Sequence, residues 1–201
     1  MLRADQLACE RGDRRLFAGV NFTLKAGQWL HLQGANGSGK TSLMRQLATL
    51  SRPANGQVLW HGQKVDEVRD DYLRDMFYWG HLPALKADLS AFENVCLSLS
   101  LAGQAPDAAR VVESLAFVGL SSRADLPAGS LSAGQQRRVT LAGLRCRAPR
   151  LWLLDEPFTS LDVAGVSLLL GLMRAHLEGG GSVVMSSHVP VDLPKPEVLA
   201  L

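Results

Sequence analysis

Apolar residues in this chain gather in short runs that end at glycine, proline or charged residues, as strands of a mixed fold do. The runs at 151–154 and 182–186 are apolar at nearly every position, so we expect them to be buried on both faces of a parallel sheet. A hairpin is expected around His61-Gly62. The predicted strands are residues 20–24, 29–33, 58–60, 64–65, 76–79, 151–154 and 182–186.

Between residues 84 and 149 the pattern becomes helical. Ser90-Ala91-Phe92-Glu93 and Ser132-Ala133-Gly134-Gln135 are capping boxes, each of which predicts a helix N-terminus. Pro106 fits the first turn of a further helix, which Gly119 could terminate.

These elements predict one α/β domain of 201 residues, with a core at about 1–83 and 150–201 and a helical lobe inserted at about 84–149. Three prolines, Pro190, Pro194 and Pro196, disfavour a helix near the end of the chain. We expect Glu197 to Leu201 to form an edge strand.

The formal net charge of +2 gives no electrostatic reason to expect a nucleic-acid partner. A local group of arginines is interpreted as a solvated basic face, with contact to lipid headgroups or to acidic loops of a partner as the alternative. The group consists of Arg137, Arg138, Arg145, Arg147 and Arg150.

Cysteine usage and hydropathy indicate a chain that works in a reducing compartment without a membrane span of its own. Cys9, Cys96 and Cys146 lie far apart and lack metal-ligand spacing, so we expect reduced thiols. The N-terminal residues do not resemble a signal peptide, and no apolar run approaches the ~20 residues that cross a bilayer.

A glycine-rich phosphate loop carries the first strong chemical signal, and its sequence is Gly34-Ala35-Asn36-Gly37-Ser38-Gly39-Lys40-Thr41. Its glycines let backbone N–H groups converge on phosphate oxygens where side chains would clash. Lys40 supplies a mobile ammonium, and the Thr41 hydroxyl can ligate Mg²⁺. A predicted strand precedes the loop and a helix follows it, which argues against a chance match and aims a helix N-terminus at the anion.

Two adjacent carboxylates follow the apolar run at 151–154, at the strand end where open α/β sheets place ligands. Asp155 is expected to hold Mg²⁺, and Glu156 to orient or deprotonate the attacking water. An Asp-Glu pair that merely caps a turn is the alternative, which the upstream phosphate loop makes much less attractive.

With Leu131-Ser132-Ala133-Gly134-Gln135 added, the motifs resemble those of ATP-binding-cassette (ABC) ATPases in order and spacing. Leu131 to Gln135 resembles the family signature, Ser160-Leu161-Asp162 its D-loop, and His188 its switch histidine, which contacts the γ-phosphate. The resemblance implies a P-loop NTPase with a RecA-like core, an antiparallel β subdomain and an inserted helical subdomain.

In that family the signature closes over the nucleotide of a second chain, so the resemblance implies a head-to-tail homodimer with ATP at its seam. The N–H groups at the N-terminus of the helix that the signature begins, together with Ser132 and Gly134, suit an anion. Catalysis is assigned to Glu156, His188 and Lys40, and Mg²⁺ to Thr41 and Asp155. The expected nucleotide contacts are Arg11, Gly34, Ala35, Asn36, Gly37, Ser38, Gly39, Lys40, Thr41, Ser42, Ser132, Gly134, Gln135 and Asp162.

Two departures from the family pattern narrow the identity. Arg11 stands where most members stack an aromatic ring on adenine, and a guanidinium can also stack on a base. Leu82 stands where most members have a glutamine that ligates Mg²⁺, and leucine cannot ligate a metal. His81 could take over that role, although a histidine satisfied by its local surroundings is an equally good interpretation.

These departures, with Gly80-His81-Leu82-Pro83 and Lys86, resemble the ATP-binding subunits of bacterial cytochrome c maturation, a haem-exporter branch of the family. That resemblance implies an ATP-hydrolysing subunit that works with separate integral-membrane transporter subunits on the cytoplasmic face of the inner membrane. The chain has no haem-binding motif, so haem enters only indirectly. The alternatives are an ABC transporter for another substrate and a non-transport ABC ATPase.

Overall fold

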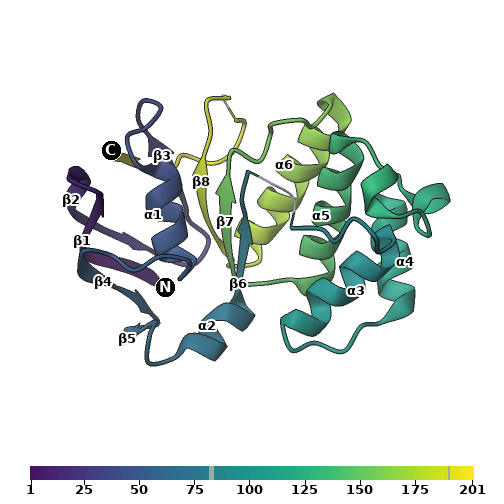
Figure 1. Ribbon diagram of the computed structural model, residues 1–201, viewed down its shortest axis with the longest axis horizontal. Coiled ribbons are helices and arrows are strands. Elements are labelled where there is room, and N and C mark those ends of the chain that lie inside the picture. Colours follow the sequence, from purple (N-terminus) through teal and green to yellow (C-terminus); the bar gives the residue numbers. More distant parts are fainter. Residues whose placement is uncertain (82–83, 190) are drawn as a thin grey trace.

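The computed structural model describes residues 1–81, 84–189 and 191–201, and within them the chain forms two sheets (Figure 1). The first sheet is antiparallel, with strand order β2-β1-β4-β5. Leu59 and Trp60 of β4 pair with Lys64 and Gln63 of β5, so the predicted hairpin around His61-Gly62 is confirmed. Its strands are β1 (Leu2–Arg11), β2 (Arg14–Leu24), β4 (Asn55–Trp60) and β5 (Gln63–Lys64).

The second sheet is parallel and has the strand order β6-β7-β8-β3-β9. The run at 151–154 lies within it as a central, fully buried strand, as its apolar sequence predicted. The predicted C-terminal edge strand is also confirmed, beside β3. The strands are β3 (Trp29–Gln33), β6 (Met76–Trp79), β7 (Leu151–Asp155), β8 (Ser182–Ser186) and β9 (Glu197–Ala200).

Alternate residues of β7 serve two hydrophobic cores, because successive side chains of a strand point to opposite faces. Leu151 and Leu153 pack in a core with α1 (Lys40–Leu47) and the antiparallel sheet. Trp152 and Leu154 pack in a second core with the remaining long helices, including α6 (Val163–Glu178). In Figure 1, α1 and α6 therefore cover opposite faces of the parallel sheet.

The helices between β6 and β7 pack on one another beside this sheet (Figure 1). Both predicted capping boxes are present, with Ser90 reciprocally bonded to Glu93 and Ser132 to Gln135. The three long helices are α3 (Ala91–Leu101), α4 (Ala108–Phe117) and α5 (Ala133–Arg147), and the short ones are η1 (Ser121–Arg123) and η2 (Ala128–Ser130).

The start of α4 differs from the prediction, because Pro106 lies before the helix rather than in its first turn. Asp107 is the N-cap, and its carboxylate accepts hydrogen bonds from the backbone N–H groups of Ala109 and Arg110. An aspartate at this position satisfies two N–H groups that a helix leaves unpaired, so it sets the boundary one residue after the proline. The predicted stop is confirmed, since Gly119 has φ +75° directly after the C-cap.

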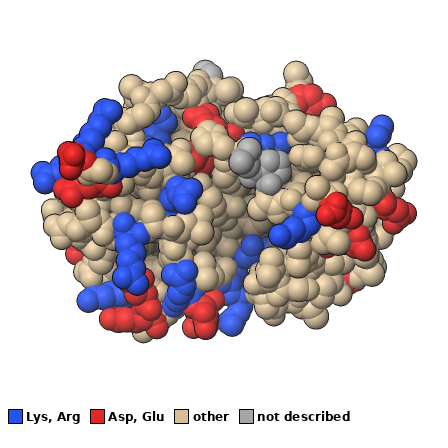
Figure 2. Space-filling view, viewed as in Figure 1, with Lys and Arg blue, Asp and Glu red and all other residues tan. Residues whose placement is uncertain are grey.

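The expected basic face of five arginines is wrong for most of its members. Arg137 is buried and donates to the backbone carbonyls of Gly80 and His81. The others also have protein partners: Arg138 bonds Asp162, Arg145 bonds Glu113, Arg147 bonds the carbonyls of Leu73 and Met76, and Arg150 lies 3.9 Å from Asp75. Basic and acidic side chains are interspersed on the face that Figure 2 shows. The guanidinium groups here therefore join α5 and the segment after it to neighbouring parts of the chain.

Among the strands and α-helices, β1, α2 (Arg69–Asp75) and α6 were not expected from the sequence, nor were the short helices η1 and η2. In β1 the pairing register shifts between Ala4 and Leu7, where Gln6 has φ +53°, so the apolar alternation of a regular strand is broken. No helix of the described residues is long and apolar enough to cross a membrane. The cysteines are free thiols. Leu82, where the chain departs from the family pattern, lies outside the described residues, and so do Pro83 and Pro190.

Candidate functional site

A hollow of about 600 Å³ opens at the carboxyl ends of the parallel strands. We call it the nucleotide hollow. The phosphate loop joins β3 to α1 on one side, and residues that follow β6, β7 and β8 close the other. It is lined by Arg11, Arg14, Leu16, Asn36, Gly37, Gly39, Lys40, Thr41, Ser42, His81, Asp155, Glu156, Thr159 and His188.

The phosphate loop depends on glycine at two positions where a side chain would collide with its surroundings. Gly39 has φ +110° as the N-cap of α1, and a Cβ there would lie 2.8 Å from the ring of Phe17. At Gly34 a Cβ would lie 2.6 Å from the Ser38 hydroxyl. No side chain caps α1, so its first backbone N–H groups remain free to bind an anion.

Lys40 reaches back across the loop that it follows. Its ammonium donates to the carbonyl oxygens of Gly34 and Ala35, at 2.7 and 3.1 Å, and the residue is 9% exposed. Thr41 and Ser42 line the hollow from the same turn of α1. A single cation therefore stands among N–H groups at the helix N-terminus, which makes this end of the hollow electropositive.

Asp155 ends β7 almost completely buried, with 1% of the residue exposed. Its Oδ1 accepts a hydrogen bond of 2.7 Å from the hydroxyl of Ser186, which lies opposite it on β8. Its Oδ2 is buried and has no hydrogen-bond partner among the described residues. A buried carboxylate oxygen left in this way is costly unless a cation or donor joins it.

Glu156 has φ +51°, a strained conformation for a residue other than glycine. Its backbone N–H donates to the carbonyl and the hydroxyl of Ser186, which fixes the turn after β7. The Glu156 Oε1 is buried, lies 3.5 Å from His188 Nε2, and has no hydrogen-bond partner among the described residues. Backbone strain of this kind is concentrated at functional sites.

Three further nitrogen-bearing side chains line the nucleotide hollow, those of Arg11, Arg14 and His81. Arg11 and Arg14, at the β1–β2 turn, line its outer rim. His81 follows β6, and its Nε2 lies 3.8 Å from Asp155 Oδ2. Burial raises the pKa of the neighbouring Tyr78 hydroxyl above its ordinary value, and the charge of Asp155 adds to that rise.

The signature residues lie at a second hollow of about 320 Å³, which we call the signature hollow. The capping box leaves the Ser132 hydroxyl bonded to the Gln135 N–H at 3.3 Å, so the start of α5 is fixed. A Cβ at Gly134 would lie 3.1 Å from the Ser160 carbonyl, so glycine allows this close approach. Its lining consists of Gly119, Leu120, Ser132, Gly134, Gln135, Arg138, Ser160 and Asp162.

Asp162 joins the signature helix to α6. It caps α6 through the Gly165 N–H and accepts two hydrogen bonds from the Arg138 guanidinium, at 2.8 and 2.9 Å. These contacts, that of the Gly165 N–H first, hold the pKa of the Asp162 carboxyl below its ordinary value. The carboxylate therefore stays charged at the rim of the signature hollow.

The candidate residues thus form two groups that share no lining residue. Lys40, Thr41, Asp155, Glu156 and His188 meet at the nucleotide hollow with Arg11 and most of the phosphate loop. Gly34, Ala35 and Ser38 belong to that loop but do not line the hollow. Ser132, Gly134, Gln135 and Asp162 meet at the signature hollow.

Four residues that line the nucleotide hollow or hold its lining in place were not predicted from the sequence. Arg14, Leu16 and Thr159 line it, and Ser186 joins Asp155 to Glu156 from below. Ser186 ends a predicted strand of the same sheet, so its place at the carboxyl edge was available as a signal. The β1–β2 turn that carries Arg14 was not, because β1 itself was not expected.

The ABC transporter family model matches residues 17–159 of the chain. The cytochrome c biogenesis ATP-binding export protein CcmA of Methylococcus capsulatus is 50% identical over 96% of this chain and 93% of its own length. The protein of the same name from Escherichia coli K12 is 46% identical over 98% of this chain and 94% of its own length.

Solved structures agree with this assignment. An ATP-binding cassette determined as a dimer in a post-hydrolysis state, bound to ADP and phosphate, has a TM-score of 0.83 at 25% identity, over 94% of this chain and 88% of its own. A putative ABC transporter ATP-binding protein from Pyrococcus furiosus superposes with a TM-score of 0.85 over all of this chain and 96% of its own, at 22% identity. The chain therefore belongs to the ABC transporter ATP-binding family, among the cytochrome c biogenesis ATP-binding export proteins.

Proposed function

We propose that this protein is the ATP-hydrolysing subunit of a transporter complex for cytochrome c maturation, in which it powers haem export or the release of a haem-loaded chaperone. The names of relatives that are 46–50% identical over nearly the whole chain support the pathway. The candidate residues are split between two hollows, so each chain would contribute one half of each of two nucleotide sites. This split supports the role of an ATP-hydrolysing subunit.

The nucleotide hollow fits a triphosphate. Backbone N–H groups at the start of α1 and the Lys40 ammonium would bind the outer phosphates, as anions prefer at a helix N-terminus. Arg11 at the rim would stack on the adenine through its planar guanidinium.

Mg²⁺ also fits the residues present. The buried Oδ2 of Asp155, which has no hydrogen-bond partner among the described residues, is an available oxygen ligand, and Thr41 lines the same hollow with a hydroxyl. When bound, the ion would neutralise charge that develops on the phosphates during transfer. Asp155, held in place by Ser186, would orient the ion directly or through water.

Glu156 is proposed to orient and deprotonate the attacking water. Its carboxylate is only 19% exposed, and its buried Oε1 is free of hydrogen bonds among the described residues, so it can accept a proton. His188, 3.5 Å away and 60% exposed, is positioned to contact the γ-phosphate from the solvent side. Removing the Glu156 charge is expected to slow ATP turnover by about 10²–10⁴-fold.

Two chains arranged head-to-tail would complete both sites. The α5 N-terminus, with Ser132 and Gly134, would face the γ-phosphate held by the partner, and the D-loop residue Asp162 would lie beside it at the seam. ATP then stabilises the closed pair because it contacts both chains, and hydrolysis removes that stabilisation. The dimeric, ADP-bound cassette at 25% identity supports this arrangement.

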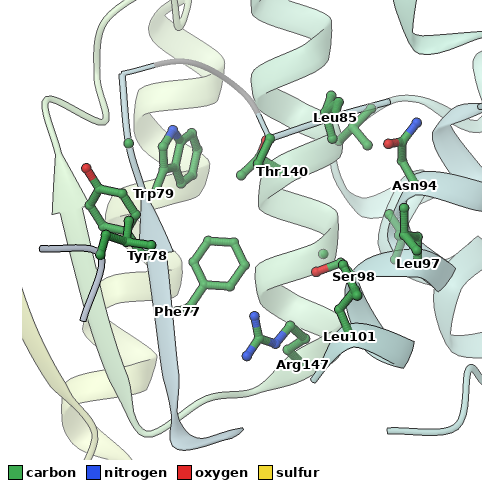
Figure 3. Close-up of a pocket in the computed structure, with 16 residues that line it drawn as sticks. Phe77, Tyr78, Trp79, Leu85, Asn94, Leu97, Ser98, Leu101, Thr140 and Arg147 are labelled. Carbon is green, nitrogen blue, oxygen red and sulfur yellow. The ribbon is translucent and has the colours of Figure 1, made fainter. Parts of the chain in front are cut away.

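An apolar groove beside β6 is proposed to receive an integral-membrane subunit. Figure 3 shows Phe77 and Trp79 of the strand facing Thr140 of α5 and the side chains of α3 across the groove, while the Tyr78 ring points to the other side of the strand. The groove holds about 390 Å³, and Leu101 at its edge is 81% exposed. The helical lobe at 84–149 would then be the part that docks on the membrane subunit. The whole chain would lie peripherally on the cytoplasmic face of the inner membrane.

The pathway is tested in cells that lack this chain, by measuring the covalently bound haem of their c-type cytochromes. We expect the haem signal to be lost and to return with the wild-type chain, but not with Glu156→Gln. Intact c-type cytochromes in the deleted cells would remove the cytochrome c role and favour a transporter for another substrate. Recovery with Glu156→Gln would remove the catalytic assignment.

A further inference from the structure

We propose that His81 supplies an imidazole ligand to the divalent cation of the nucleotide, beside Asp155, which gives this chain a metal preference shifted from Mg²⁺ towards Mn²⁺ and other transition ions. The inference rests on the proposed ATPase function and adds one residue and one cofactor property to it. It starts from the strand register. Trp79 of β6 pairs with Leu154 of β7, so the residues after β6 run alongside Asp155.

The His81 imidazole faces Asp155 Oδ2, a buried carboxylate oxygen that has no hydrogen-bond partner among the described residues. Nε2 lies 3.8 Å from Asp155 Oδ2, and the side chain of His81 is 55% exposed on the hollow. That separation is too long for a hydrogen bond. Adjacent ligands of one octahedral ion stand about 3 Å apart when each bond is about 2.1 Å, so Nε2 and Oδ2 would have to approach by less than about 1 Å to share an ion.

The backbone at His81 is held in place by the signature helix. The buried guanidinium of Arg137, on α5, donates to the carbonyl of Gly80 at 3.0 Å and to that of His81, and it stacks over the Trp79 ring at 5.5 Å. The side chain of the next residue in the sequence, Leu82, has no metal-binding atom. His81 is therefore the donor that this segment can offer, from a fixed point on the chain.

A nitrogen donor changes which ions bind well. Mg²⁺ takes oxygen ligands almost exclusively, whereas imidazole suits transition ions such as Fe²⁺ and Ni²⁺. Mn²⁺ also favours oxygen but accepts an imidazole more readily than Mg²⁺ does. A site with Asp155, Thr41 and His81 should thus discriminate against Mg²⁺ more than a site in which an amide oxygen replaces the imidazole. His81→Gln restores such an oxygen and is the informative variant.

The test uses the Mn²⁺ complex of ATP with the full chain in a Glu156→Gln background, which keeps ATP intact. Electron spin-echo spectroscopy compares protein carrying natural histidine with protein carrying ¹⁵N-histidine. We expect a histidine-dependent nitrogen coupling that disappears in His81→Ala and His81→Gln and persists in His188→Ala, the other imidazole of the hollow. The ratio of Mn²⁺ to Mg²⁺ affinity for the nucleotide complex should fall by about tenfold in His81→Gln.

Three outcomes are decisive. A coupling that survives His81→Ala overturns the proposal, and so does Mn²⁺–ATP bound without any histidine coupling, which would reduce His81 to a charge partner of Asp155. Failure of Mn²⁺–ATP to bind at all would instead overturn the proposed function and this inference with it. Unchanged folding of the two His81 variants is checked by their thermal unfolding, with His61→Gln, an exposed histidine outside the hollow, as the control.

Discussion

Ser186 holds both acidic residues of the nucleotide hollow although it belongs to neither motif. Its hydroxyl donates to Asp155 Oδ1 and accepts from the Glu156 N–H, and the residue is fully buried. One small side chain thus orients the proposed metal ligand and the proposed base together. Misplacement of catalytic groups by fractions of an ångström slows reactions strongly.

We expect Ser186→Ala to lower ATP turnover by about tenfold and to reduce the free energy of unfolding by about 1–2 kcal/mol, because Asp155 Oδ1 would lose its donor inside the protein. Turnover assays and urea unfolding measure the two effects. Ser167→Ala is the matched control, since the Ser167 hydroxyl bonds only the carbonyl of Val163 on an exposed helix face. Equal behaviour of the two variants would show that Ser186 has no positioning role.

His176 predicts that the free energy of unfolding depends on pH, independently of catalysis. Burial lowers the pKa of this imidazole, stacked 4.0 Å from Trp152, to about 4, against the opposing effect of the Ser182 carbonyl. The unfolded chain binds a proton below about pH 6.5, whereas the folded chain resists it until about pH 4. Stability is therefore complete above about pH 6.5 and is lost as the pH falls towards 4.

Between pH 7 and pH 5 we expect this histidine to remove about 2 kcal/mol from the free energy of unfolding. Urea unfolding at both values measures it, with His176→Phe as the comparison, because phenylalanine keeps the stacking on Trp152 and does not titrate. If His176→Phe loses as much stability as the wild type on acidification, the pH dependence arises elsewhere.

The signature helix α5 is fastened to the core by arginines along its length. Arg137 binds the backbone after β6, Arg138 binds Asp162 before α6, and Arg147 binds the carbonyls of Leu73 and Met76. The helix that carries the signature is therefore joined to the strand end that carries His81 and to the D-loop. Movement of α5 is expected to move both segments.

Arg137→Met removes the donors and keeps most of the side-chain volume. We expect it to lower the free energy of unfolding by about 2 kcal/mol, since two partly buried hydrogen bonds lose their charged donor. Arg123→Met, at an exposed position, should change stability by less than about 0.5 kcal/mol. Urea unfolding compares the pair, and similar losses in both variants would contradict the anchoring role of Arg137.

Elements with a regular apolar pattern or a local cap were predictable. The buried strand at 151–154, the hairpin around His61-Gly62 and the caps at Ser90 and Ser132 all have their determinants within a few residues. The misses have distant determinants. The irregular register of β1 is set by its two neighbours, and Arg137 is buried because carbonyls 57 and 56 residues away accept its N–H groups.

The site shows the same division. Phosphate-loop and acidic residues were predicted from motif chemistry and the signature residues from the family resemblance, and the parallel sheet brings the first two groups to one edge. Ser186 and Arg14 were not identified, because their contribution depends on which strands become neighbours. Motif chemistry identifies residues that touch a ligand better than those that hold them in place.

Across the whole molecule, the decisive feature is the separation of the nucleotide hollow from the signature hollow within one chain. Each hollow holds groups suited to a phosphate, yet they share no residue. A second copy, related by a head-to-tail arrangement, would bring the two kinds of hollow together twice. This predicts that ATP, and not ADP, joins the chains, because only the γ-phosphate would reach both.

The mass of Glu156→Gln in solution, measured by light scattering with Mg²⁺–ATP and with Mg²⁺–ADP, tests this arrangement most directly. Ser132→Trp in the same background blocks the signature hollow and leaves the nucleotide hollow of its own chain intact. We expect twice the mass of one chain with ATP, the mass of one chain with ADP, and a single chain that still binds ATP when Ser132→Trp is added. A single-chain mass with ATP bound to Glu156→Gln, or an unchanged dimer with Ser132→Trp, would contradict a site shared between two chains.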